Sequence, residues 1–348
     1  MKIAQLFYGT IPPSGYGGIE RMVFWLSRAL VQLGHEVVIV ASHVGPEVAE
    51  AGIEFRPWPD NLNHLSQLLS DVDVMHFHQP FLASFKPCHP YIITEHGNHR
   101  GPSPVLPNTV FISSSHAKNH GAKYFVYNGI PLEDYPLQTK HKKGLLFMAL
   151  LSWTKKNAKT AINLAFDTKM SIHVCGGDVW NEPKIRGIWK WRAKNNENKA
   201  LINAVGEVDG PRKLELLQKS SLLFYIVNWQ EPFALAPHEA MATGTPVLCS
   251  PNGALPEYIV DGENGYIVSS YNDARAAIKR FQSLSFSEKN KMYENCRNTA
   301  FSILDSAEEY LKAYKKVISE QYLYPPQNAQ TFKFKPKKTA VVKHWLEF

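Results

Sequence analysis

Two glutamates with seven residues between them are the side chains best suited to chemistry in this chain of 348 residues. Glu231 stands just before a run of apolar positions at helical spacing, and Glu239 falls about two turns into the helix that this spacing predicts. The helix start would aim backbone N–H groups and the positive end of a dipole at a space with a carboxylate on either side. A phosphate joined to a hydroxyl-rich sugar fits such a space. Taken alone, the pair is more simply two solvated charges at a helix start.

A second candidate site is the glycine-rich turn at residues 15–18, which contains Gly17 and Gly18. Glycines after a first strand let the backbone approach a phosphate closely, although a tight turn without a ligand would look the same. The turn does not match G-x-G-x-x-G, and the next strand ends at residues 41–43 without an acid to hold a ribose. A nicotinamide dehydrogenase is therefore not expected. The chain also lacks G-x-x-x-x-G-K-[ST], which argues against a P-loop NTPase.

Strands and helices are expected to alternate along the whole chain. In the first half a strand at 2–7 is followed by a helix from Ile19 to Leu33 and a strand at 35–40. Further strand candidates in this half are residues 53–55, 72–77, 91–94, 110–113 and 124–126. The chain changes character at 128–144, which we interpret as a linker, and the alternation then restarts. This pattern predicts two Rossmann-like α/β domains with doubly wound parallel sheets that face a shared cleft.

Composition narrows the class of protein. A hydrophobic content of 44% and a charged content of 20% are ordinary for a globular protein, and 348 residues favour two domains. The net charge of +7 suits nucleotides, acidic ligands or an anionic membrane surface, and does not by itself indicate nucleic acid. Four scattered cysteines argue for a reducing compartment and against structural zinc. With no signal peptide and no long apolar run, we expect a cytoplasmic protein.

An ordered set of short motifs resembles one enzyme family over most of residues 1–320. In chain order these are GGIER at 17–21, LGHEV at 33–37, DVMHFH at 73–78, TEHG at 94–97, FISSS at 111–115, NGIP at 128–131, GEV at 206–208, E-x7-E at 231–239, GTPV at 244–247, GALPE at 253–257 and DGENG at 261–265. The set is similar to the family 4 retaining glycosyltransferases of the GT-B fold. The order of the motifs decides this, since no single motif does.

The resemblance implies an enzyme that moves a sugar from a UDP- or GDP-sugar to a hydroxyl group of a glycan, lipid or small molecule. It also implies retention of configuration, no metal and no other cofactor, and no nucleic-acid partner. The implied domains are an acceptor-side domain at 1–138 and a nucleotide-sugar-binding domain at 139–304. A C-terminal helix and tail at 305–348 would return towards the first domain.

The family's functional residues map onto this chain as follows. Glu239 is expected to bind the ribose hydroxyls with both carboxylate oxygens, and Glu231 to contact a hydroxyl of the transferred sugar. His96 is expected near the reaction centre. One of Lys155 and Lys156 is expected beside the diphosphate, and the spacing favours Lys156. With Glu239, the residues expected to bind the nucleotide sugar, largely through their backbone, are Gly17, Gly18, Gly206, Val208, Phe233, Ala234 and Leu235.

The chain departs from the family pattern at two positions. Leu150 stands where the family carries an arginine, and Ala234 replaces the commoner glycine of E-P-F-G. Losing a cation from a diphosphate site removes a few kcal/mol of charge-assisted bonding, which puts efficient turnover in doubt. Two alternatives therefore stay open: a sugar-nucleotide 2-epimerase of the same fold, and a non-catalytic sugar-nucleotide-binding protein.

Three weaker signals have simpler interpretations. The D-x-D at 71–73 is the run-in to a buried strand, and His76 and His78 face one side of that strand without a third zinc ligand at useful spacing. A basic and aromatic patch at 180–192 and a basic tail at 333–345 offer a peripheral contact with the inner face of a membrane. A solvated helix with packed tryptophans is the favoured explanation of the patch. For the tail, a strap across the domains and a mobile end remain open alternatives.

Overall fold

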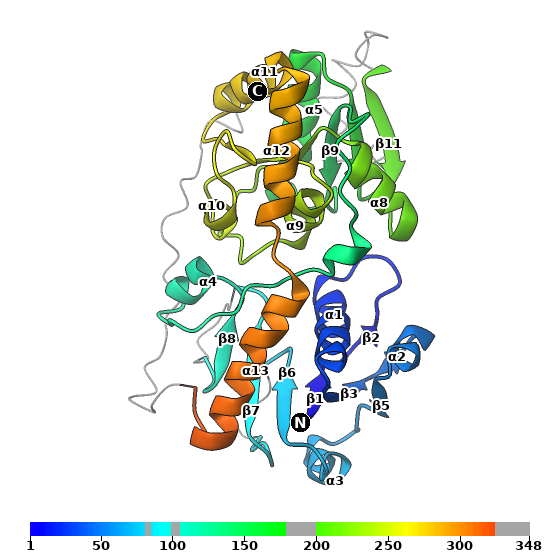
Figure 1. The fold of residues 1–348 in the computed structure, drawn as a ribbon, viewed down its shortest axis with the longest axis vertical. Helices are drawn as coiled ribbons and strands as arrows, with labels where there is room; N and C mark the ends of the chain where they lie inside the picture. Colours follow the sequence, from blue (N-terminus) through cyan, green and yellow to red (C-terminus); the bar gives the residue numbers. More distant parts are fainter. Residues whose placement is uncertain (81–84, 99–104, 179–199, 324–348) are drawn as a thin grey trace. The chain divides into compact units, whose positions relative to one another are not determined.

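The computed structural model of the protein describes residues 1–80, 85–98, 105–178 and 200–323 (Figure 1). The chain divides into two compact units. The N-terminal unit joins Met1–Pro131 to the segment that begins at Phe301, and the C-terminal unit is Leu132–Ala300. The domain boundaries expected after residues 138 and 304 stay predictions. The patch at 180–192 and the tail at 333–345 lie outside the described residues.

The N-terminal unit contains a parallel sheet, and six of its strands lie within the described residues. Their order is β5 (Glu54–Pro57), β3 (Glu36–Ala41), β1 (Lys2–Leu6), β6 (Val74–Phe77), β7 (Tyr91–Glu95) and β8 (Thr109–Phe111). Two short strands, β2 (Thr10–Ile11) and β4 (His43–Val44), follow β1 and β3 in the sequence and form a separate parallel pair. The order runs outwards in both directions from β1, as in a doubly wound Rossmann sheet.

Side chains of the strands in this sheet alternate between two environments. One face carries an apolar cluster that includes Leu6, Val40 and Phe77. The intervening positions, such as Gln5 and His76, therefore point to the opposite face, where the strand register places them side by side. Polar side chains thus lie buried within one face of an otherwise apolar sheet.

The helices of the N-terminal unit come from both ends of the chain. They are α1 (Gly18–Gln32), α2 (Pro46–Glu50), α3 (Leu65–Leu68), α4 (Ser114–Asn119) and α13 (Ile303–Glu320). The last of these, α13, contacts α1 and β7 (Figure 1). The chain re-enters the unit at Phe301 and passes Gly129, where an added Cβ would lie 2.1 Å from the carbonyl oxygen of Ser302. This crossing therefore requires a glycine.

The C-terminal unit repeats the same strand order in its described part. Its parallel sheet runs β11 (Ile202–Gly206), β10 (Ile172–Cys175), β9 (Leu145–Met148), β12 (Leu222–Tyr225), β13 (Val247–Cys249) and β14 (Gly265–Ile267). The helices are α5 (Ala158–Thr168), α8 (Gly210–Lys219), α9 (Leu235–Ala242), α10 (Leu255–Tyr258), α11 (Tyr271–Ser283) and α12 (Phe286–Thr299). The expected α/β architecture with two Rossmann-like sheets is confirmed.

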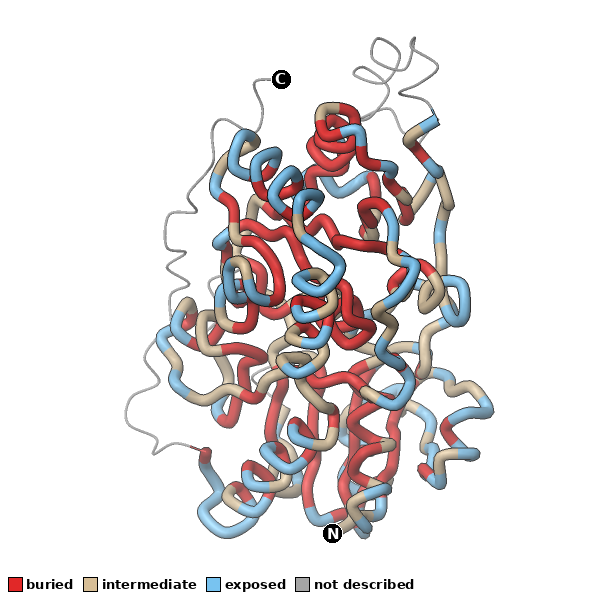
Figure 2. The backbone as a smooth tube through the Cα atoms, turned by 45° about the horizontal axis from the view of Figure 1, so that its top comes forward, coloured by how far each residue is buried: buried red, intermediate tan, exposed pale blue. Residues whose placement is uncertain are grey.

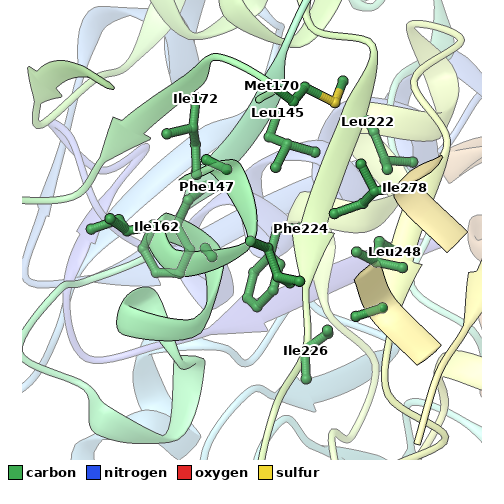
Figure 3. Packing of buried hydrophobic residues seen from close by; sticks show 14 of the residues in the cluster. Leu145, Phe147, Ile162, Met170, Ile172, Leu222, Phe224, Ile226, Leu248 and Ile278 are labelled. Carbon is green, nitrogen blue, oxygen red and sulfur yellow. The ribbon is translucent and has the colours of Figure 1, made fainter. Parts of the chain in front are cut away.

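The core of the C-terminal unit lies between this sheet and its helices. Figure 3 shows Phe147 and Phe224 on neighbouring strands, with Ile162 of α5 and Ile278 of α11 packed near them. Figure 2 shows buried residues along the strands and exposed residues on the outer turns of the helices. The apolar face of each amphipathic helix thus covers the sheet, which holds the strand ends in place.

The strand order of the C-terminal unit predicts where a ligand-binding crevice would lie. The order reverses between β9 and β12, and ligands of such sheets bind outside the carboxyl ends of the strands at this point. Lys156 follows β9 and Glu231 follows β12, so both signature side chains leave the sheet at the switch point. Among the helices that the structure describes, none has the length and apolar character needed to cross a membrane.

The core interpretation gives a test. Phe224→Ala should lower the free energy of unfolding of the C-terminal unit by about 3–5 kcal/mol, because it removes a ring that is 1% exposed and leaves a cavity. Phe286→Ala is the matched control, since that ring is 66% exposed and its removal should change the free energy little. Urea unfolding measures both. Equal effects of the two substitutions would contradict the assigned core.

Candidate active site

Glu231 accepts three hydrogen bonds on one carboxylate oxygen. Lys156 Nζ, the Tyr225 hydroxyl and Trp229 Nε1 each donate to Oε2 at 2.9 Å. Lys156 Nζ also donates to the Tyr225 hydroxyl at 2.5 Å. The lysine and the glutamate are both buried, so each charge depends on the other to offset the cost of leaving water. The geometry brings two expected site residues, Lys156 and Glu231, into direct contact.

Local backbone structure holds this cluster in place. Lys156 ends a short 3-10 helix, and the left-handed residue Asn157 (φ 56°) turns the chain into α5. The Asn157 amide donates to the carbonyl of Ile226 at 3.0 Å, which ties this turn to the end of β12. On the other side, the N–H of Ala254 donates to the Glu231 carbonyl at 2.8 Å. The preceding residue, Gly253, must be a glycine, since a Cβ there would lie 2.1 Å from the carbonyl oxygen of Glu231.

The second oxygen of Glu231 is available to a ligand. Among the described residues, no hydrogen bond reaches Oε1 of Glu231, and this atom is not one of the fully buried side-chain atoms that lack a partner. The protein therefore holds the carboxylate through one oxygen and leaves the other as an acceptor. Such an oxygen suits a sugar hydroxyl, because an ionised acceptor strengthens the hydrogen bond.

Glu239 repeats this arrangement on α9. Its Oε1 accepts from Lys213 Nζ and from the Tyr135 hydroxyl, the latter at 2.8 Å. Its Oε2 receives no hydrogen bond within the described part of the chain and is not among the fully buried unpartnered atoms. The sequence led us to expect that both oxygens of Glu239 bind a ribose diol, but only Oε2 is unengaged. Either both hydroxyls of the diol would donate to Oε2, or one hydroxyl would donate to it alone.

The start of α9 lies between the two glutamates in the chain. No side chain caps this helix, and its first N–H donors come from Leu235 and Ala236, since Pro237 has none. Phe233 is buried, and its carbonyl accepts from the Tyr258 hydroxyl at 2.7 Å. The backbone before the helix is thereby held while the first-turn donors remain without a cap.

Ala234, the N-cap of α9, adopts an uncommon backbone conformation. Its φ of 80° and ψ of 108° lie where a side chain crowds the backbone and glycine does not. This is the position at which the family motif carries glycine. The substitution, which looks mild from residue types alone, stores strain at the helix start.

The remaining nucleotide-site positions precede α8. Gly206 ends β11 with a φ of 82°, and Val208 follows it in the loop that leads to α8. This helix carries Lys213 to Glu239, so the loop and the second glutamate are connected through one helix. Leu150 lies half-buried in the turn after β9, and its carbonyl accepts from the Trp153 N–H at 3.1 Å.

The N-terminal unit holds the other three expected site residues. Gly17 is the N-cap of α1 and Gly18 is its first residue; a Cβ on Gly17 would lie 2.7 Å from the Pro13 Cβ. His96 follows β7, and its Nε2 lies 3.0 Å from Nδ1 of His78. Burial lowers the pKa of His96 to about 3, so this imidazole is neutral near pH 7.

The weaker sequence signals have structural explanations. Asp71 forms ion pairs with Arg56 at 2.7 Å and Lys2 at 2.6 Å, and Asp73 accepts from the Lys2 N–H at 2.8 Å. Both aspartates precede β6, at the amino end of the sheet. Within the part of the chain that the structure describes, no three His, Cys, Asp or Glu side chains gather as metal ligands would.

Sequence reasoning missed four side chains of the site. Tyr225 ends a strand at the switch point, so the strand-end rule could have identified it. Trp229 lies two residues before Glu231 and could have been found by its nearness. Lys213 and Tyr135 gave no signal, because a lysine on a helix and a tyrosine in a linker are ordinary surface choices.

Comparison with protein families accounts for both halves of the chain. The family model described as Glycosyl transferases group 1 matches residues 136–302, and the model described as Glycosyltransferase Family 4 matches residues 16–129. The chain belongs to the family 4 glycosyltransferases of the GT-B fold. The expectation drawn from the ordered motifs is thereby confirmed.

Individual relatives of the chain match over shorter segments. Spore coat protein SA of Bacillus subtilis (strain 168) is 33% identical over 129 residues, which are 36% of this chain and 33% of that protein. D-inositol 3-phosphate glycosyltransferase of Corynebacterium efficiens is 33% identical over 64 residues, or 18% of this chain and 15% of that protein. The matched segments thus span a third or less of these curated relatives.

Solved structures resemble the chain along almost its whole length. AviGT4, a glycosyltransferase involved in avilamycin A biosynthesis, has a TM-score of 0.70 and 23% identity, covering 92% of this chain and 98% of its own. Anabaena Alr3699/HepE, solved in complex with UDP and glucose, has a TM-score of 0.70 and 13% identity, covering 91% and 100%. At these identities the likeness concerns the fold.

The strain at Ala234 gives a prediction. Ala234→Gly should raise the free energy of unfolding by about 1 kcal/mol, because it removes the Cβ from a backbone with positive φ. Ala240→Gly, the same change inside α9, should lower the free energy instead. Thermal unfolding distinguishes the two. A loss of stability in Ala234→Gly would remove the strain argument.

Buried histidines predict a pH dependence of stability. Burial lowers the pKa of His76 well below its usual 6.5, whereas the unfolded chain still binds a proton near 6.5. Below pH 6.5 the unfolded state therefore binds more protons than the folded state. As the pH falls, the free energy of unfolding of the N-terminal unit should decrease by up to about 1.4 kcal/mol per pH unit because of this histidine. His76→Gln should reduce that slope in unfolding measurements between pH 7 and pH 5. An unchanged slope would contradict the assignment.

Proposed function

We propose that this glycosyltransferase moves a sugar from a UDP- or GDP-sugar to a hydroxyl group of a glycan, lipid or small molecule. The observation that carries the proposal is that Glu231 and Glu239 are held in the same way. Each has one oxygen bound to protein donors, and each keeps the other oxygen unengaged within the described residues. A site that prepares two carboxylate acceptors around an uncapped helix start suits a sugar–diphosphate–ribose ligand.

In the proposed complex the two glutamates have separate roles. Oε2 of Glu239 accepts from a ribose hydroxyl, and Oε1 of Glu231 accepts from a hydroxyl of the transferred sugar. The N–H groups at the start of α9 bind the diphosphate, whose negative charge grows as the glycosidic bond breaks. Donors that are already oriented stabilise that charge without further reorganisation.

Lys156 and Lys213 supply the positive charges of the proposed site. Each lysine forms an ion pair with one of the two glutamates, so the position of its ammonium group is fixed relative to that carboxylate. We infer that these lysines take over part of the charge neutralisation that Leu150 does not provide. That the reaction needs no metal ion is the expectation that the family resemblance implies.

Family membership and one solved relative support the remaining parts of the proposal. Retention of configuration is the stereochemical course that the family resemblance implies, with the leaving phosphate helping to deprotonate the acceptor. Anabaena Alr3699/HepE was solved with UDP and glucose, which favours a uridine nucleotide among the donors to be tried first. We place His96 of the N-terminal unit near the reacting sugar.

The proposal is tested by incubating the protein with UDP-, GDP- and ADP-sugars together with glycan, lipid and small-molecule acceptors that carry hydroxyl groups. The release of nucleoside diphosphate is measured with and without EDTA, and with and without the acceptors. We expect release from one donor, unaffected by EDTA, and a product whose anomeric NMR signal has the configuration of the donor. An epimerase would change the sugar without an acceptor. A non-catalytic binder would show thermal stabilisation by nucleotide without release.

The site assignment predicts a matched pair of variants. Glu239→Gln should weaken nucleotide binding roughly 10- to 100-fold, because it removes a charged acceptor and leaves Lys213 without its ionised partner. Glu215→Gln, which removes an exposed carboxylate from the same helix as Lys213, should leave binding unchanged. Calorimetric titration with the preferred nucleotide measures both. Unchanged affinity in Glu239→Gln would show that the ribose assignment is wrong.

A further inference from the structure

A buried chain of hydrogen bonds connects the β-sheet of the N-terminal unit to His96. The chain contains Gln5 of β1, His76 of β6, Thr94 of β7 and His78, together with Tyr310 and Tyr314 of α13. These six side chains are at most 3% exposed. The polar face of the sheet and the C-terminal helix thus enclose a network that the family motifs only partly cover.

The amide of Gln5 sets the direction of this network. Its Nε2 donates to the Tyr314 hydroxyl at 3.1 Å, so its Oε1 is left to accept. The only donor that His78 can offer Oε1 is an N–H at Nε2, which lies 2.6 Å away. His78 therefore carries a proton on Nε2.

The next bond transmits this choice to His96. Burial lowers the pKa of His78 well below 6.5, so its ring is neutral and holds one proton. With that proton on Nε2, Nδ1 of His78 is an acceptor, and it lies 3.0 Å from Nε2 of His96. His96 must then donate from Nε2, which leaves its Nδ1 without a proton.

We propose that Gln5, acting through His78, is a positioning residue that holds His96 as the Nε2–H tautomer and presents Nδ1 as an acceptor. His96 is half-buried, and within the described part of the chain Nδ1 has no hydrogen-bond partner. A neutral imidazole with an accepting nitrogen suits a hydroxyl group of a bound sugar.

The opposite end of the network continues the direction of hydrogen bonding that starts at the amide of Gln5. The Tyr314 hydroxyl accepts from Gln5 and donates to Nδ1 of His76 at 2.7 Å, and Nε2 of His76 then donates to Thr94 at 2.7 Å. Thr94 shares a further bond of 2.9 Å with the Tyr310 hydroxyl. Reversing the amide would require every one of these bonds to reverse with it. Helix α13 therefore acts on His96 through three hydrogen bonds, which join Tyr314 to Gln5, Gln5 to His78 and His78 to His96.

The tautomer does not rest on the proposed function, whereas its effect on turnover does. The two are separated by reading the tautomer directly, in the absence of substrate, from the ¹⁵N shifts of the ring nitrogens of labelled histidine. The His96 signals are assigned by their loss in His96→Gln. In the wild-type protein we expect protonated Nε2 and unprotonated Nδ1 for both His78 and His96.

Gln5→Met removes both hydrogen-bonding groups at similar length and should convert the single His96 tautomer into a mixture. Tyr314→Phe removes the acceptor of the amide and the partner of His76, but leaves every group bonded to His78 and His96 in place. If Gln5→Met does not fold, Tyr314→Phe decides by the same criterion. Ser27→Ala is the control, since Ser27 is buried in the same unit but bonds only within α1. This control should leave the tautomer unchanged.

The proposal is overturned if wild-type His96 is protonated on Nδ1, or if the deciding variant keeps the wild-type tautomer. Once a donor is known, the mixture of tautomers should lower kcat about tenfold with KM nearly constant. If the tautomer changes as expected while His96→Gln turns over normally, the network stands and the catalytic placement of His96 is wrong.

Discussion

The buried ion pair between Lys156 and Glu231 is the interaction on which the arrangement of the C-terminal unit depends. Its two members leave the sheet from strands on either side of the point where the strand order reverses. A charge of either sign alone would be costly at this depth, so the pair must form together with its tyrosine and tryptophan donors. Once it forms, the free oxygen of the carboxylate has a defined direction, and the loop into α9 has a defined start.

A division of labour within each carboxylate recurs at the second glutamate. In both cases the protein engages one oxygen and leaves the other for a ligand, which orients the side chain before anything binds. Orientation in advance lowers the entropic cost of binding. The donors come from several elements of the fold. A donor on a neighbouring helix or strand restrains a carboxylate more firmly than solvent does, which lowers the same entropic cost.

Much of the fold follows from local patterns, and the departures are instructive. The first strand, the glycine-rich turn and the helix after it were predicted because apolar spacing and glycine placement are local signals. Residues 124–126 were expected to be a strand but provide only an isolated bridge between Phe111 and Phe125. At the site, Glu231 and Glu239 were found from spacing, whereas Lys213 became visible only through tertiary contact. Likewise, a glutamine in a short strand gives no sign that it lies beside a histidine from a distant strand.

The position of α13 has a consequence for synthesis of the chain. The N-terminal unit is discontinuous, since its sheet is made from the first 131 residues and its last helix from residues beyond Phe301. On the ribosome its polar sheet face therefore waits for the whole C-terminal unit to be translated before Tyr310 and Tyr314 can satisfy it. Domains that emerge complete usually fold in order from the N-terminus. Here the interior unit is the first that can finish folding, and the N-terminal unit is completed last.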